Sequence, residues 1–145
     1  MNRIRLTVTA IVAASLLAAA CGSSGADTTT AVTAADGSGA VFGRGSVPAT
    51  VPESFPIPDE AVVGATLVDT NRGVTEMVLN LPATFAAAVA YYEQNLPGSG
   101  YEVTSSGGSE VEWEMVFIGG DADGTVGVKA AGNGLSSIAV QLTHP

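Results

Sequence analysis

The sequence predicts an α+β fold, in which an antiparallel sheet of about six strands carries one helix packed on one face. Several segments alternate apolar and polar residues, one segment places apolar residues at helical spacing, and short glycine-containing turns join them. The chain has 145 residues, 46% of them hydrophobic, which suits one domain with a sizeable core. We expect the order ββαββββ within residues 51–145.

The first half of this domain contains two strands and the helix. Val62–Asp69 and Val74–Leu81 flank the turn Asn71-Arg72-Gly73 and predict a hairpin. Thr84 is a suitable N-cap for a helix over Phe85–Leu96, which the following Pro97 and Gly98 should end. The residues expected on the buried helix face are Phe85, Ala88, Val89, Tyr92 and Leu96.

The second half predicts four strands. Turns at residues 119–124 and 132–134 are short, so we expect these strands to pair antiparallel. The expected strands are residues 101–105, 110–117, 125–130 and 137–143.

One helix is too narrow for a sheet of this width. Six strands spaced about 4.8 Å apart span roughly 24 Å, whereas a helix with its side chains is about 10–12 Å wide. The uncovered strip must curl over, bind a ligand or be covered by the proline-rich segment before the first strand. We favour the last, since Val51, Phe55 and Ile57 are otherwise unexplained apolar residues in a loop.

Residues 1–20 have the pattern of a secretory signal peptide. Arg3 and Arg5 precede fifteen uncharged residues, which end in small side chains at Ala18-Ala19-Ala20. Fifteen helical residues span roughly 22 Å, which is too short for a permanent membrane-spanning helix.

The only cysteine follows directly. Leu17-Ala18-Ala19-Ala20-Cys21 resembles the lipobox of bacterial lipoproteins, although Ala18 stands where that family usually has leucine. The resemblance implies a diacylglyceryl group on Cys21, cleavage before that residue, and a protein anchored on the extracytoplasmic side of the cell membrane. Ordinary signal peptidase cleavage after Ala20, which would release a soluble protein, is the alternative.

The segment after the cysteine predicts a tether. Residues 21–50 are mainly small and polar and should form a disordered linker. Removing residues 1–20 leaves three bases against 14 acids, a net charge of −11. This charge argues against a nucleic-acid partner and favours cationic or uncharged ones, either an envelope protein or a small molecule.

A second resemblance covers about fifteen residues around the helix end. The pattern of Tyr91-Tyr92, Leu96, Gly100-Tyr101 and Val103 resembles small uncharacterised lipoproteins of high-G+C bacteria. It implies a helix that packs against a sheet and no known activity.

The sequence offers few groups for catalysis. One cysteine and one histidine exclude an internal disulfide and the usual zinc sites, and we predict no cofactor or metal. Asp121-Ala122-Asp123-Gly124 is typical of a turn, since the flanking positions lack the carboxylates of a calcium loop. His144, next to the last residue, should be too mobile for a general base.

The strongest candidates for chemistry are Glu110, Glu112 and Glu114, which alternate along one strand. Paired carboxylates catalyse glycoside hydrolysis, but such alternation is also the solvent face of a half-buried strand, which we favour. Trp113 should belong to the core. We therefore expect a non-enzymatic, lipid-anchored binding module. A small envelope hydrolase using these glutamates and a purely structural lipoprotein are the alternatives.

Overall fold

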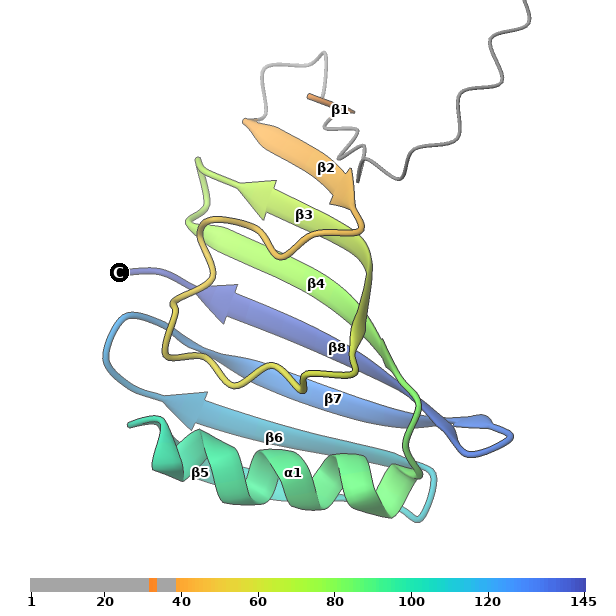
Figure 1. The fold of residues 1–145 in the computed structure, drawn as a ribbon. Coiled ribbons are helices and arrows are strands. Elements are labelled where there is room, and N and C mark those ends of the chain that lie inside the picture. Colours follow the sequence, from red (N-terminus) through yellow and green to blue (C-terminus); the bar gives the residue numbers. More distant parts are fainter. Residues whose placement is uncertain (1–31, 34–38) are drawn as a thin grey trace, which may run out of the picture.

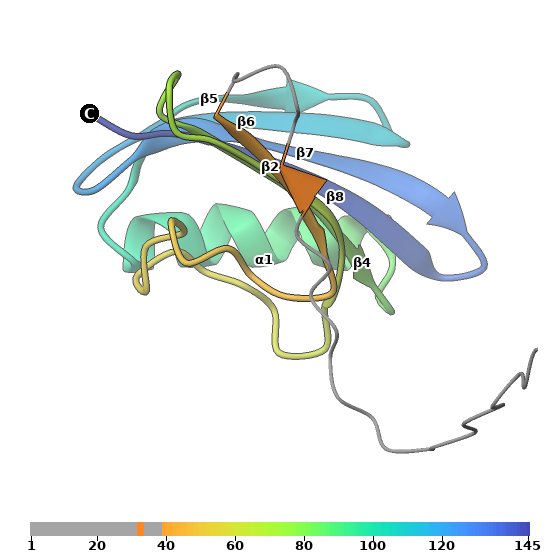
Figure 2. The same cartoon turned by 90° about the horizontal axis from the view of Figure 1, so that it is seen from above.

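The computed structural model describes residues 32–33 and 39–145, and within them it confirms the predicted α+β class. One helix packs on one face of an antiparallel sheet (Figures 1 and 2). The predicted signal peptide, Cys21 and most of the predicted linker lie outside the described residues.

The described strands form one eight-stranded sheet, two more than expected, in the order β1-β2-β3-β4-β8-β7-β6-β5. All neighbouring strands are antiparallel. The elements are β1 (Val32–Thr33), β2 (Ala40–Arg44), β3 (Val62–Asp69), β4 (Val74–Leu81), α1 (Phe85–Gly98), β5 (Glu102–Gly108), β6 (Glu112–Ile118), β7 (Asp123–Gly132) and β8 (Leu135–Thr143).

The additional strands lie at the N-terminal edge. The prediction of a disordered linker through residue 50 is wrong for Val32–Thr33 and Ala40–Arg44, which form β1 and β2. β2 pairs along β3 from Ala40–Asp69 to Arg44–Ala65. The physical reason is tertiary. Without β2, β3 would leave a row of backbone N–H and C=O groups unpaired, and even a short segment can satisfy them.

The helix begins where the sequence predicts and ends slightly later. Thr84 Oγ1 accepts a hydrogen bond from the Ala87 N–H at 3.3 Å, as expected for an N-cap. Pro97 lies in the last turn and the helix continues to Gly98. α1 connects the central β4 to the edge strand β5 and lies on one face of the sheet, in front of β5 in Figure 1. The strands β5, β6, β7 and β8 then follow one another across the sheet back to β4.

The connection from β2 to β3 covers part of the same face as α1. Figure 2 shows this proline-rich segment, residues 45–61, on the side of the sheet that carries the helix. Val51 and Phe55 are buried, and Ile57 is partly buried against the core cluster that contains them. The predicted covering role of these three residues is thus confirmed.

The core between the sheet and these two coverings contains alternate strand residues. Phe55 lies 5.8 Å from Phe117 and 5.9 Å from Tyr101, measured between ring centroids. The residues in this core with no exposed surface are Leu79, Ala88, Tyr92, Leu96, Met115, Phe117, Val126, Val128, Ile138 and Leu142. The packing of Tyr92, Leu96 and Tyr101 between helix and sheet follows the prediction.

Candidate binding surfaces

The first half of α1 is incompletely covered and borders a hollow of about 450 Å³. Phe85 and Val89, expected to be buried, are only partly so, and they face Trp113 across this hollow. Trp113 was predicted to be a core residue but is also only partly buried. Glu93 and Glu110 also line the hollow. We call these five residues, with Gly108 at the end of β5 and Ser109 of the following turn, the helix groove.

A chain of hydrogen bonds fixes one side of the helix groove. The Trp113 indole Nε1–H donates to Ser106 Oγ at 2.9 Å, and Ser106 Oγ donates to Glu93 Oε1 at 3.3 Å. Ser106 lies on β5, Trp113 on β6 and Glu93 on α1. The chain therefore joins all three elements and holds a carboxylate beside an aromatic ring.

The structure does not place the three predicted glutamates in one row. β6 begins at Glu112, and the preceding Glu110 lies in the turn and lines the helix groove. Glu112 and Glu114 instead lie on the opposite face of the sheet. Both belong to β6, in which alternate side chains point to the same face. Glu112 Oε1 is 2.8 Å from Lys129 Nζ, and this contact raises the pKa of Lys129.

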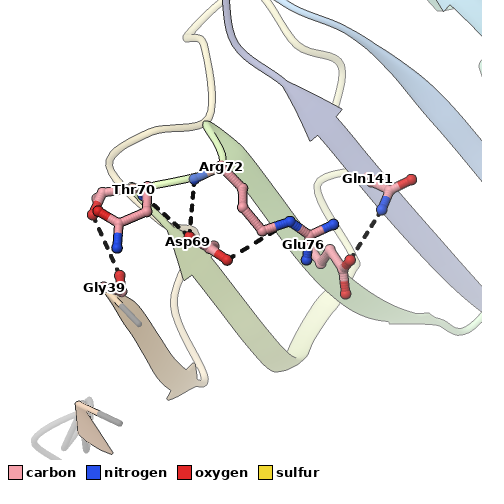
Figure 3. Close-up of polar contacts among 7 residues, drawn as sticks. Gly39, Asp69, Thr70, Arg72, Glu76 and Gln141 are labelled. Carbon is pink, nitrogen blue, oxygen red and sulfur yellow. Dashed lines mark hydrogen bonds and ion pairs between the residues drawn. The ribbon is translucent and has the colours of Figure 1, made fainter. Parts of the chain in front are cut away.

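The face of the sheet away from α1 forms a shallow trough of about 560 Å³. Gly127 and Ala139 are paired at the floor of the trough, in the middle of the sheet. The floor is low there because these residues have little or no side chain. Gln141 Nε2 donates to Glu76 Oε1 at 3.0 Å across β4 and β8, and Figure 3 shows this pair beside the β3–β4 turn. The wall toward β2 includes the half-exposed ring of Phe42.

His144 is held in place, contrary to the expectation of a frayed end. Its backbone N–H donates to Gly73 O at 2.8 Å, and its Nε2 lies 3.0 Å from Thr75 Oγ1. Thr75 Oγ1 in turn lies 2.7 Å from Thr50 Oγ1. These bonds tie the start of the proline-rich segment to β4 and to the end of the chain, and they give His144 a structural role.

The acidic turn after β6 is smaller than expected. Ala122 N–H donates to Gly119 O at 3.0 Å, and β7 already begins at Asp123. Asp123 Oδ1 accepts a hydrogen bond from the Gly119 N–H at 3.1 Å. Within the described ranges, no group of three His, Cys, Asp or Glu side chains is arranged to hold a metal ion.

One buried polar group in the core lacks a partner within residues 32–33 and 39–145. The Tyr92 hydroxyl makes no hydrogen bond to these residues, and the side chain has no exposed surface. Burial, and secondarily Tyr91, raises the pKa of Tyr92 far above its ordinary value of 10.0. Tyr92 lines neither the helix groove nor the trough.

The sequence contained a signal for the helix groove that our prediction did not use. Phe85, Val89 and Glu93 follow one another at four-residue spacing, so they share one side of α1. Because Glu93 follows two apolar residues on that side, the sequence indicates that this side of the helix lies at the edge of the core. The partners of this line, Ser106 and Trp113, depend on the pairing of β5 with β6, which sequence spacing does not fix.

Residues 32–33 and 39–145 contain no helix with the length and apolar character needed to cross a membrane. Comparisons of the chain with protein-family models, curated proteins and solved structures found no match. Its function must therefore be inferred from its own residues.

Proposed function

We propose that this protein is a lipid-anchored binding module on the extracytoplasmic side of the cell membrane. The observation that carries the proposal is the position of Cys21, directly after a basic start, a short apolar segment and three small residues. A thiol at this position is the attachment point of the diacylglyceryl group in the family that the segment resembles.

The proposed anchor is sufficient by itself. Each buried CH₂ group contributes about 0.8 kcal/mol to membrane binding, and one acyl chain alone binds only marginally. Two chains on Cys21 give stable attachment without a basic patch. The net charge of −11 after removal of residues 1–20 would keep the folded part away from an anionic bilayer surface.

The side-chain geometry favours binding over catalysis. Glu112 forms an ion pair with Lys129, and Glu110 lies on the other face of the sheet, so these carboxylates do not converge on one reacting atom. His144 contacts Thr75, whose hydroxyl is buried and unavailable as a nucleophile. The helix groove, in contrast, combines exposed apolar surface with fixed polar groups, as ligand sites do.

Metabolic labelling tests the anchor. Cells expressing the full chain are grown with a clickable fatty acid, and the protein is followed in membrane and soluble fractions. We expect label and membrane retention for the natural sequence, loss of both for Cys21→Ala, and no change for the neighbouring control Ser23→Ala. Label retained by Cys21→Ala, or an unlabelled natural protein in the culture medium, would refute the proposal.

A further inference from the structure

β5 is an edge strand with a free side. It pairs with β6 on one side, and no described strand lies on the other (Figure 1). Its residues from Thr104 to Gly108 are exposed. The segment contains neither proline nor lysine, the residues with which sheet edges are commonly protected from further pairing.

The pairing of β5 with β6 shows which backbone groups are available. Ser109 N–H donates to Glu112 O at 2.7 Å, and hydrogen-bonded pairs alternate along an antiparallel ladder. Gly107–Glu114 and Ser105–Val116 continue this series in the observed register. The backbone N–H and C=O groups of Ser106 and Gly108 therefore point away from β6, toward the free side.

The helix groove adjoins these two residues. Ser106 pairs with the buried Met115 and contacts Glu93, so its side chain is on the face that carries α1. Gly108 itself lines the groove. A strand added beside β5 would place the side chains opposite Ser106 and Gly108 on this same face, because directly opposed residues share a face of the sheet.

The negative charge of the helix groove favours basic side chains in a segment that binds there. Glu93 and Glu110 are its charged residues, and its lining contains no lysine, arginine or histidine. The rings of Phe85 and Trp113 favour the aliphatic stem of a basic residue and interact with its cationic head. The whole chain carries a charge of −9, which also attracts a basic partner.

We propose that β5 receives an extended basic segment of a partner protein as an additional strand. Main-chain hydrogen bonds to Ser106 and Gly108 hold the segment, and basic side chains two residues apart reach Glu93 and Glu110. This inference rests on the binding part of the proposed function and names the class of partner. It does not depend on the lipid anchor.

A second copy of this chain fits the edge less well. Two β5 strands placed side by side would bring two helix grooves, each lined by Glu93 and Glu110, to one boundary, and this accumulation of like charge opposes such a pairing. The charge balance thus favours a basic partner over self-association.

Fluorescence anisotropy with a short labelled peptide of alternating lysine and valine tests the proposal on the full mature protein in non-ionic detergent. We expect saturable binding that weakens on the order of tenfold when Glu93→Gln and Glu110→Gln are combined. Glu114→Gln on the opposite face is the matched control and should bind within about twofold of the natural protein.

Two control peptides separate strand addition from simple charge attraction. A glutamate–valine peptide should not bind, and N-methylation of alternate residues in the lysine peptide should abolish binding by removing its ladder donors. Full binding of the N-methylated peptide, no effect of the double variant, no binding of the lysine peptide, or self-association of the protein would each overturn the inference. If the fatty acid labels the protein at Cys21 but the lysine peptide does not bind, the proposed anchor stands and the proposed basic partner is refuted.

Discussion

The two faces of the sheet are made by the same strands but differ in what covers them. On one face, α1 and the proline-rich segment bury Phe117, Leu79 and Val128 completely. On the other face, the middle of the sheet is floored by Ala139 and Gly127 and remains open. Stability therefore comes mainly from the covered face. The open face and the β5 edge are available for contacts with other molecules without loss of the fold.

The largest expected effect is on the covered face. Phe117→Ala should lower the free energy of unfolding by about 3–5 kcal/mol, because the ring contacts Phe55 and Tyr101 and has no exposed surface. Val78→Ala on the open face should cost less than about 1 kcal/mol. Urea denaturation followed by circular dichroism measures both, and equal losses would show that the faces do not differ as described.

Phe55→Ala tests whether the proline-rich segment is part of the covering. We expect a loss of about 3 kcal/mol, because Phe55 is buried among Tyr92, Tyr101 and Phe117. Val47→Ala, near the start of the segment and 41% exposed, should change stability by less than about 0.5 kcal/mol. A small effect of Phe55→Ala would mean that this segment does not close the core.

Tyr92→Phe should stabilise the covered face by about 1 kcal/mol, because the lost hydroxyl is buried and has no partner in the described part of the chain. Tyr101→Phe is the contrasting control, since that hydroxyl lies 3.2 Å from Ser54 Oγ. Thermal unfolding should show a higher midpoint for Tyr92→Phe and an unchanged or lower one for Tyr101→Phe. A lower midpoint for Tyr92→Phe would indicate a partner for the hydroxyl.

The same substitution should change stability at alkaline pH. The pKa of Tyr92 is raised on folding, so its neutral form is favoured in the native state and its contribution is constant below pH 10.0. Above that value the unfolded state loses the proton first, and stability falls. Tyr92→Phe should make this alkaline decline less steep, as urea titrations at several pH values would show.

Thr84→Ala should have the smallest effect, about 0.5 kcal/mol, through the N-cap of the helix that closes the covered face. Thr143→Ala, an exposed threonine outside α1, should leave stability within error. Equal effects of the two changes in urea denaturation would argue against a capping role for Thr84.

The regular elements could be predicted because their patterns are local. β3 and β4 have the predicted bounds, and Met77, Leu79 and Leu81 of β4 are buried as their alternation indicates. Strand β2 could not be predicted in the same way. Ala40–Arg44 is short and contains a glycine, and its pairing depends on the unpaired edge of β3.

The candidate site was predicted only in part. Alternation placed Glu112 and Glu114 correctly on an exposed face, but Glu110 departs from it because β6 starts two residues later. Phe85, Val89 and Trp113 have the spacing of core residues. They line a groove, whereas the residues of α1 that are buried in the core are Ala88, Tyr92 and Leu96.

Amide hydrogen exchange measured by NMR, with and without the lysine–valine peptide, tests most directly whether the β5 edge is the contact site. The peptide should slow exchange at Ser106 and Gly108 by about tenfold or more and leave Ser105 and Gly107 unchanged, because these already bond to β6. Exchange that slows at Gly127 and Ala139 in the trough, or without alternation along β5, would contradict this assignment.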